Sequence, residues 1–222
     1  ASAFGYVNEA SGLASSALGF RNKAANENAS AVGYGNNANA LAASAVGYNN
    51  TAGGVGSSTI GYNNTATNEN ASAFGYGNTA GGLASSAFGF SNTASGDNAN
   101  AFGYNNIASG SKSNVFGTGN TVSGSSSNAV GTANEVAAEN STAIGNNNTI
   151  SSGAENSAAL GNNISISLKD SVALGNNSTA TAINSVTGNS SYTKWAGVSD
   201  VVGVVSVGSS GATRQIQNVA AG

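Results

Sequence analysis

The chain of 222 residues contains 32 Gly, lacks Pro, Cys, Met and His, and has only 7% charged residues. Without cysteine it can form neither disulfides nor thiolate metal sites, and without histidine as well it has no Ser/His or Cys/His nucleophile pair. A net charge of −3 with no basic stripe argues against nucleic-acid binding.

The hydrophobic fraction of 39% contains much alanine, so few large side chains are available for a core. A large apolar side chain contributes roughly 1.5–3 kcal/mol when fully buried, whereas ordering one residue costs about 1–2 kcal/mol of backbone entropy. Backbone pairing and contacts between chains must therefore supply the stabilisation that the small core lacks. This favours an oligomer. No stretch of 18 consecutive apolar residues is present, so no membrane-spanning segment is predicted.

A repeat of 14 residues runs from the first residues to residue 175. In each copy a small residue and a large apolar residue precede a glycine, and only one step between glycines departs from 14, being 16. The glycines of this repeat are Gly5, Gly19, Gly33, Gly47, Gly61, Gly75, Gly89, Gly103, Gly117, Gly131, Gly145, Gly161 and Gly175. Because the copy at Ala1–Gly5 starts in mid-repeat, we expect the chain to be part of a longer protein.

The stretch 72–76, Ser-Ala-Phe-Gly-Tyr, represents the first strand of each copy. Side chains alternate between faces along a strand. We therefore expect Ala73 and Gly75 to share one face and Phe74 and Tyr76 the other. Because both faces carry apolar or very small residues, this strand is predicted to be buried on both sides.

A turn and a second strand follow in each copy. Asn78 is expected to form the turn, because asparagine tolerates a left-handed backbone and bonds to its own chain. Ala80 is the single apolar residue of a second strand, which is expected to have one face exposed to solvent. Two strands in 14 residues predict a β-roll, with the asparagines stacked as a ladder of amides.

Thirteen such coils, stacked about 4.8 Å apart, predict a rod on the order of 60 Å long. The two additional residues before Gly161, around Gly153 to Ser157, are expected to bulge one loop and leave the fold intact. The second face of the first strand still lacks a partner. A symmetric assembly around a central axis would provide it.

The repeat resembles the head of trimeric autotransporter adhesins of the YadA-like type. The stretches 30–33, 44–47 and 171–175 carry the serine-led strand that ends in small–aliphatic–glycine, and 204–209 and 214–222 are similar to the neck that follows such heads. The resemblance implies an all-β, trimeric left-handed parallel β-roll ending in a neck. It implies head repeats over 1–181, a head-to-stalk transition and neck over 182–222, and no cofactor.

The aromatic column is the main surface candidate for ligand binding. It consists of the residues that follow the first eight glycines, namely Tyr6, Phe20, Tyr34, Tyr48, Tyr62, Tyr76, Phe90 and Tyr104. Tyr34, Tyr48, Tyr62 and Tyr76 are the candidate contacts for a host protein or glycan. The favoured interpretation is structural: a stacked ladder that shields the edge of each protomer.

The remaining candidates lie near the C-terminus, and the resemblance gives them a structural role in the trimer or neck. Trp195 is either a recognition anchor or, as we favour, a plug at the base of the rod. Arg214 is expected to bond between chains, with Asp200 or a backbone carbonyl as acceptor. The other neck residues in this set are Ile216, Asn218 and Val219.

The resemblance implies a homotrimeric adhesin head on the surface of a Gram-negative bacterium, with its membrane anchor elsewhere in the full chain. Family targets are host cell-surface or extracellular-matrix proteins such as collagen, fibronectin or laminin. A structural spacer, with residues 1–175 carrying a ligand-binding domain outward, is the alternative. An ice-binding solenoid, which would need a flat regular threonine array, ranks low, and an enzyme is favoured least.

Overall fold

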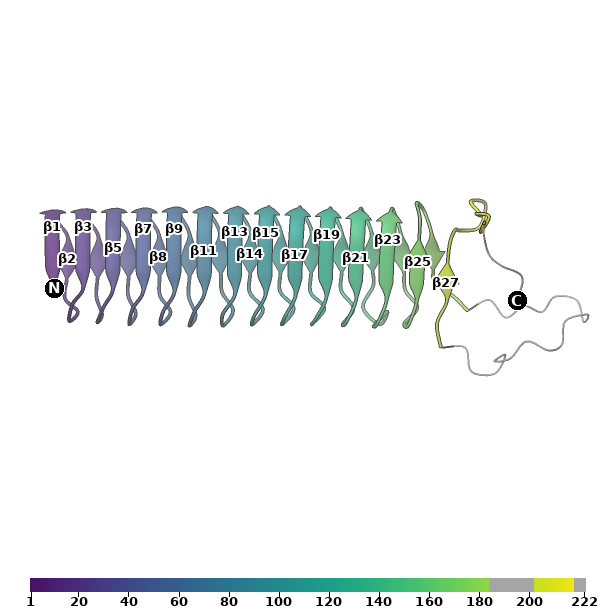
Figure 1. Cartoon of the computed structure of the whole chain (residues 1–222), viewed down its shortest axis with the longest axis horizontal. Helices are drawn as coiled ribbons and strands as arrows, with labels where there is room; N and C mark the ends of the chain where they lie inside the picture. The colour runs from purple at the N-terminus through teal and green to yellow at the C-terminus, as the bar shows by residue number, and fades with distance from the viewer. Residues whose placement is uncertain (184–201, 218–222) are drawn as a thin grey trace, which may run out of the picture.

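Each 14-residue unit forms one coil of a solenoid, with a long strand, a tight turn, a short strand and a connection (Figure 1). The computed structural model describes residues 1–183 and 202–217. The long strands are β1 (Ser2–Tyr6), β3 (Ser16–Phe20), β5 (Ser30–Tyr34), β7 (Ser44–Tyr48), β9 (Ser58–Tyr62), β11 (Ser72–Tyr76), β13 (Ser86–Phe90), β15 (Asn100–Tyr104), β17 (Asn114–Thr118), β19 (Asn128–Thr132), β21 (Thr142–Asn146), β23 (Ala158–Asn162) and β25 (Val172–Leu174). The short strands are β2 (Glu9–Ala10), β4 (Lys23–Ala24), β6 (Asn37–Ala38), β8 (Thr51–Ala52), β10 (Thr65–Ala66), β12 (Thr79–Ala80), β14 (Thr93–Ala94), β16 (Ile107–Ala108), β18 (Thr121–Val122), β20 (Glu135–Val136), β22 (Thr149–Ile150), β24 (Ser165–Ile166) and β26 (Thr179–Ala180).

The long and short strands form two parallel sheets that run the length of the rod. In the described part of the chain one sheet has 14 strands and the other has 13. Equivalent residues pair from coil to coil, so that Ala73 lies beside Ala87 and Ala80 beside Ala94. The prediction of a solenoid of two-stranded, 14-residue coils is confirmed. Among the described residues there is no helix with the length and hydropathy needed to cross a membrane.

The core is a thin layer of small side chains between the two sheets. Ala73 from the long strand and Ala80 from the short strand are both fully buried, as their counterparts are in neighbouring coils. Larger residues, Val122, Val136 and Ile150, take the place of Ala80 in later coils. The predicted alternation is therefore confirmed, with alanine filling most of the core and valine or isoleucine filling part of it in the later coils.

The prediction that Gly75 shares the core face with Ala73 is wrong. Gly75 is exposed, and it adopts a φ of +117°. In this conformation an added Cβ would point along the rod and lie 2.1 Å from the carbonyl oxygen of Gly89. Glycine is thus required because the backbone of the next coil occupies the position of a side chain.

The buried asparagines form the predicted ladder. The side-chain Nδ2 of Asn78 lies 3.0 Å from Oδ1 of Asn64. The same Nδ2 donates to the carbonyl oxygens of Phe74, at 2.9 Å, and Gly89, at 2.7 Å. Oδ1 of Asn78 accepts from the backbone N–H of Asn92 at 2.9 Å. Each amide therefore joins three successive coils.

The turn next to this ladder differs from the prediction for Asn78. The left-handed residue is the one before the ladder asparagine, namely Gly77 in this coil and Asn63 in the coil before it. Asn78 itself uses its amide to satisfy backbone groups in the interior. In several turns the sequence has two adjacent asparagines. Only their contacts with the neighbouring coils show which one has the left-handed backbone and which one belongs to the ladder.

A second left-handed position lies in the connection, where Ala84 has a φ of 52°. Asn70 holds the equivalent position of the preceding connection at 57°. Asparagine tolerates this region better than alanine. We expect Ala84→Asn to raise the free energy of unfolding by about 0.5–1 kcal/mol, measured by urea denaturation. The reverse change, Asn70→Ala, should lower it by a similar amount, and a loss in both variants would contradict this account.

The two-residue insertion lies in the connection between β22 and β23, as predicted. Gly145 and Gly161 pair in register although 16 residues separate them. Gly153, with a φ of 92°, lies in the enlarged loop, and an added Cβ there would meet nothing within 4 Å. The insertion therefore bulges outward and leaves both sheets continuous.

A further strand, β27 (Val205–Ser206), extends the long-strand sheet beyond β25. The backbone N–H of Val204 donates to the Ser171 hydroxyl at 3.1 Å, and the Val204 side chain packs against the core. The N–H of Thr179 donates to the carbonyl of Gly208 at 2.9 Å. Residues 204–208 thus continue the stacking of the coils. The boundary at residues 181 and 182 stays a prediction.

Candidate binding face

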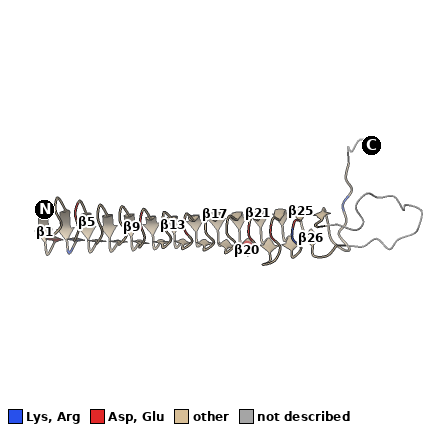
Figure 2. Cartoon of the chain, turned by 90° about the horizontal axis from the view of Figure 1, so that it is seen from below, with Lys and Arg blue, Asp and Glu red and all other residues tan. Residues whose placement is uncertain are grey.

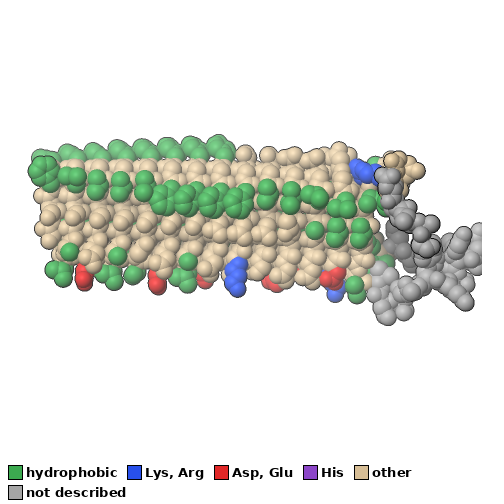
Figure 3. All heavy atoms as spheres, in the orientation of Figure 1, with side chains coloured by type: hydrophobic (Ala, Val, Ile, Leu, Met, Phe, Trp, Pro, Cys, Tyr) green, Lys and Arg blue, Asp and Glu red, His purple; other side chains and the backbone are tan. Residues whose placement is uncertain are grey.

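The outer face of the long-strand sheet carries two columns of large apolar side chains (Figure 3). One is the aromatic column already defined, which runs along one edge and stops part-way along the rod. The other, which we call the apolar column, consists of the residues that precede the repeat glycines: Phe4, Leu18, Val32, Val46, Ile60, Phe74, Phe88, Phe102, Phe116, Val130, Ile144, Leu160 and Leu174.

The apolar column points away from the core because its members follow the buried alanines of the long strands. Ile60 is 47% exposed and Phe116 is 44% exposed, although both lie in the middle of a strand. Phe74, Phe88, Phe102 and Phe116 stack on one another with ring centroids 4.7–5.1 Å apart. The single chain thus leaves a continuous apolar strip uncovered, where the sequence predicted that a partner is needed.

The aromatic column is a regular stack of parallel rings. The rings of Tyr34, Tyr48, Tyr62 and Tyr76 have centroids 4.8–4.9 Å apart and planes within 6° of parallel. Neighbouring rings cover each other's faces, so that the ring edges and hydroxyl groups remain exposed. A sugar ring cannot stack on faces that are already occupied, and this geometry favours the structural interpretation of the column.

The contribution of this stack to stability can be measured at Tyr62, which stacks on Tyr48 and Tyr76 at 4.9 Å each. Threonine occupies the same column at Thr118 and Thr132. We expect Tyr62→Thr to fold and to lower the free energy of unfolding by about 2 kcal/mol, because two ring pairs are lost. Thr118→Tyr, which adds a ring next to Tyr104, should raise it. An unchanged urea midpoint for Tyr62→Thr would contradict a structural role.

The sequence reasoning missed a third column, at the tips of the connections. This loop-tip column, eight residues after each repeat glycine in the first seven copies, consists of Leu13, Glu27, Leu41, Val55, Glu69, Leu83 and Asp97. Leu83 is 43% exposed and Leu41 is 44% exposed. Hydrophobic and acidic side chains lie along this lower edge of the rod (Figure 3). The 14-residue spacing could have revealed the column, but aliphatic and acidic residues alternate in it and conceal the period.

Arg214 bonds to the last coil of its own chain. Its Nη1 donates to the Ser178 hydroxyl at 3.1 Å and to the carbonyl oxygen of Val207 at 2.7 Å. Its Nη2 donates to the carbonyl oxygen of Asn176. The guanidinium therefore lies beside Ser178, which holds the ladder position two coils after Asn148, the last asparagine of the ladder. A bond from Arg214 to another chain stays a prediction.

The other neck candidates have different outcomes. Ile216 is exposed. Trp195, Asp200, Asn218 and Val219 lie outside the described residues.

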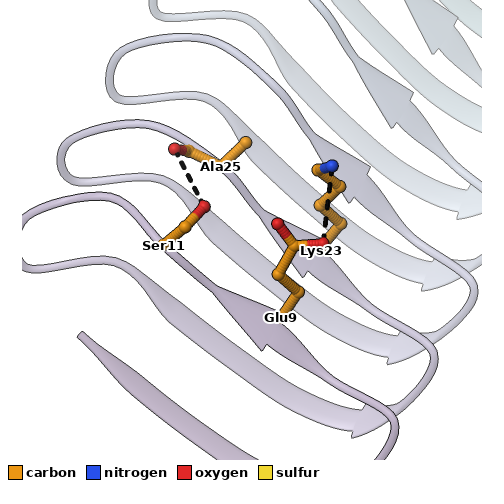
Figure 4. Close-up of polar contacts among 4 residues, drawn as sticks. All are labelled: Glu9, Ser11, Lys23 and Ala25. Atoms are coloured by element: carbon orange, nitrogen blue, oxygen red, sulfur yellow. Dashed lines mark hydrogen bonds and ion pairs between the residues drawn. The ribbon is translucent and has the colours of Figure 1, made fainter.

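Charged residues are scattered along the coils (Figure 2). On the short-strand face Lys23 pairs with Glu9 at 3.4 Å, next to a hydrogen bond from the Ser11 hydroxyl to the carbonyl of Ala25 (Figure 4). An exposed pair of this kind contributes about 0–1 kcal/mol. Among the described residues no three His, Cys, Asp or Glu side chains gather as metal ligands. The exposed apolar face of the long-strand sheet is the best candidate for contact with other copies of the chain.

The model of one protein family, the YadA head domain repeat (2 copies), matches the chain in several segments. The matched residues are 10–36, 52–78, 80–106, 123–148 and 169–186. Together they cover more than half of the chain. No curated protein matches it.

Proposed function

Because the chain belongs to the family of YadA-type adhesin heads, we propose that it attaches a Gram-negative bacterium to host proteins of the collagen, fibronectin or laminin class. Heads of this family are trimers at the cell surface that bind surface targets. The proposal extends this general role to one class of ligand. It also assigns the membrane anchor to another part of the full protein.

The observation that carries the proposal is the uncovered apolar column. It runs through 13 coils, and residues such as Ile60 and Phe116 remain more than two-fifths exposed in the single chain. Burying a large apolar side chain contributes roughly 1.5–3 kcal/mol. Three copies arranged with these columns around one axis would bury the strip and supply the core that alanine alone cannot provide.

The trimer then presents its outer surface to the ligand. This surface repeats the same short-strand pattern every coil, and it is rich in Thr, Asn and Ser with few charges. A weak contact repeated along a rod and on three chains gives tight overall attachment through avidity. A polar, adaptable surface suits an extended partner such as a matrix protein.

A structural spacer is the second candidate. The uniformity of the coils favours it, because equivalent residues pair from β1 to β25 without a break for a binding loop. In that case the trimer forms but the ligand binds to another domain of the longer protein.

The test is carried out on the whole chain. Light scattering should give the mass of three chains, unchanged on dilution. The trimer should then bind to at least one of immobilised collagen, fibronectin and laminin. A folded single chain at high dilution would overturn the trimer, and a trimer that binds none of these proteins would support the spacer.

A further inference from the structure

We infer that, in the proposed trimer, the aromatic column of one protomer packs against the loop-tip column of the next. The inference rests on the proposed function only for the presence of three copies. It assigns a partner to two exposed columns, and it makes the second copy of this chain that partner.

The first observation is that the aromatic residues of one column and the aliphatic residues of the other are confined to the same first eight coils of the rod. The aromatic column ends at Tyr104, and Thr118 follows it one coil later. The last aliphatic residue of the loop-tip column is Leu83, and the equivalent positions after Asp97 are polar or charged: Ser111, Ser125, Glu139, Glu155 and Lys169. The apolar column between them continues to Leu174, so the change is not a general loss of apolar residues. Two columns that change character together are expected to contact each other.

The second observation is that the columns lie at opposite ends of the long strands. Tyr76 ends β11, whereas Leu83 lies in the connection that leads into the start of β13. Figure 3 shows the corresponding hydrophobic rows along opposite edges of the rod. A ring of three copies uses a heterologous interface, in which one edge of each protomer meets the opposite edge of the next. With the apolar columns around the axis, these two edges are the ones that meet.

The third observation is the chemistry of the two edges. Each aromatic ring is stacked on its neighbours, so it offers its edge to an aliphatic side chain such as Leu41 or Val55. In the loop-tip column Glu27 lies between the levels of Phe20 and Tyr34, and Glu69 lies between those of Tyr62 and Tyr76. Their carboxylates can accept hydrogen bonds from the tyrosine hydroxyls of the adjacent copy. The loop-tip column thus offers aliphatic side chains to the ring edges of the aromatic column and carboxylates to its tyrosine hydroxyls.

Disulfide cross-linking tests the contact, because the chain has no cysteine of its own. The double variants are Tyr76→Cys with Leu83→Cys and Phe90→Cys with Leu83→Cys, since Leu83 lies between the levels of the two rings. Within one chain the two substituted positions of each double variant lie about 13 Å apart along the strand direction, too far for a disulfide. Under mild oxidation at least one double variant should run as three linked chains on a non-reducing gel. The single variants Tyr76→Cys, Leu83→Cys and Phe90→Cys should each run as one chain.

Phe88→Cys is the matched control, because its side chain belongs to the apolar column and should face the axis. Three identical thiols can form only one disulfide, so this variant should link two chains. If it links two chains while neither double variant links any, the inference is overturned and the trimer stands. If no variant is linked and light scattering gives the mass of one chain, the trimer itself is overturned.

Discussion

Replacing Gly75 by alanine should prevent the coils on both sides from stacking and lower the free energy of unfolding by more than about 4 kcal/mol. The new Cβ would lie 2.1 Å from the carbonyl oxygen of Gly89, and backbone atoms of a packed sheet cannot move aside. The φ of +117° adds a further penalty of about 1–3 kcal/mol for a residue with a side chain. Circular dichroism during urea denaturation measures the loss.

Gly53→Ala is the control for this experiment, because it makes the same chemical change at another glycine of the rod. Gly53 lacks the positive φ, and its added Cβ would meet its nearest neighbour, the carbonyl oxygen of Ala66, at 3.7 Å. Its stability should stay the same or rise by up to about 1 kcal/mol. Equal losses at Gly53 and Gly75 would contradict the account of the repeat glycines.

Replacing Asn64 by alanine should lower the free energy of unfolding by about 4 kcal/mol, the second large effect. The change removes the bonds from Nδ2 to the carbonyl oxygens of Ile60, at 3.0 Å, and Gly75, at 2.8 Å. It also removes the acceptor of the Asn78 N–H, 3.0 Å from Oδ1. Each buried polar group left without a partner costs about 1–3 kcal/mol. Denaturant midpoints of the purified variants measure the effect.

The neighbouring residue, Asn63, provides the control. It has the same side chain, but it is exposed and takes the left-handed position of the turn, with a φ of 58°. Asn63→Gly should change the stability by a few tenths of a kcal/mol, since glycine adopts this conformation freely. A large loss for Asn63→Gly together with a small loss for Asn64→Ala would reverse the roles assigned to the two residues.

The 14-residue period made most of the fold predictable from sequence. In-register stacking follows directly from it, because identical coils bury identical positions, and the alternation around Ala73 identified the core. The close approach of the next coil to Gly75 and the bonds from the Asn78 amide to backbone carbonyls could not be predicted. Both depend on the backbone of the adjacent coils, which side-chain alternation within one strand does not describe.

The candidate site was predictable only in part. The period alone placed Tyr34, Tyr48, Tyr62 and Tyr76 in one column, but the occupied ring faces became apparent only from the stacking geometry. The loop-tip column was missed because Leu41 and Glu69 share a position that tolerates both kinds of side chain at an exposed loop. The acceptors of Arg214 include the carbonyl of Val207, on the segment that joins the last coil.

Because the strands pair continuously from β1 to β25, the rod can become longer or shorter without a change in its cross-section. Each coil touches only the coils before and after it, so an in-frame gain or loss of one repeat would join equivalent positions and leave every remaining interface as it was. Descendants of such a gene can therefore differ in how far they extend, in increments of about 4.8 Å, while keeping the same surface.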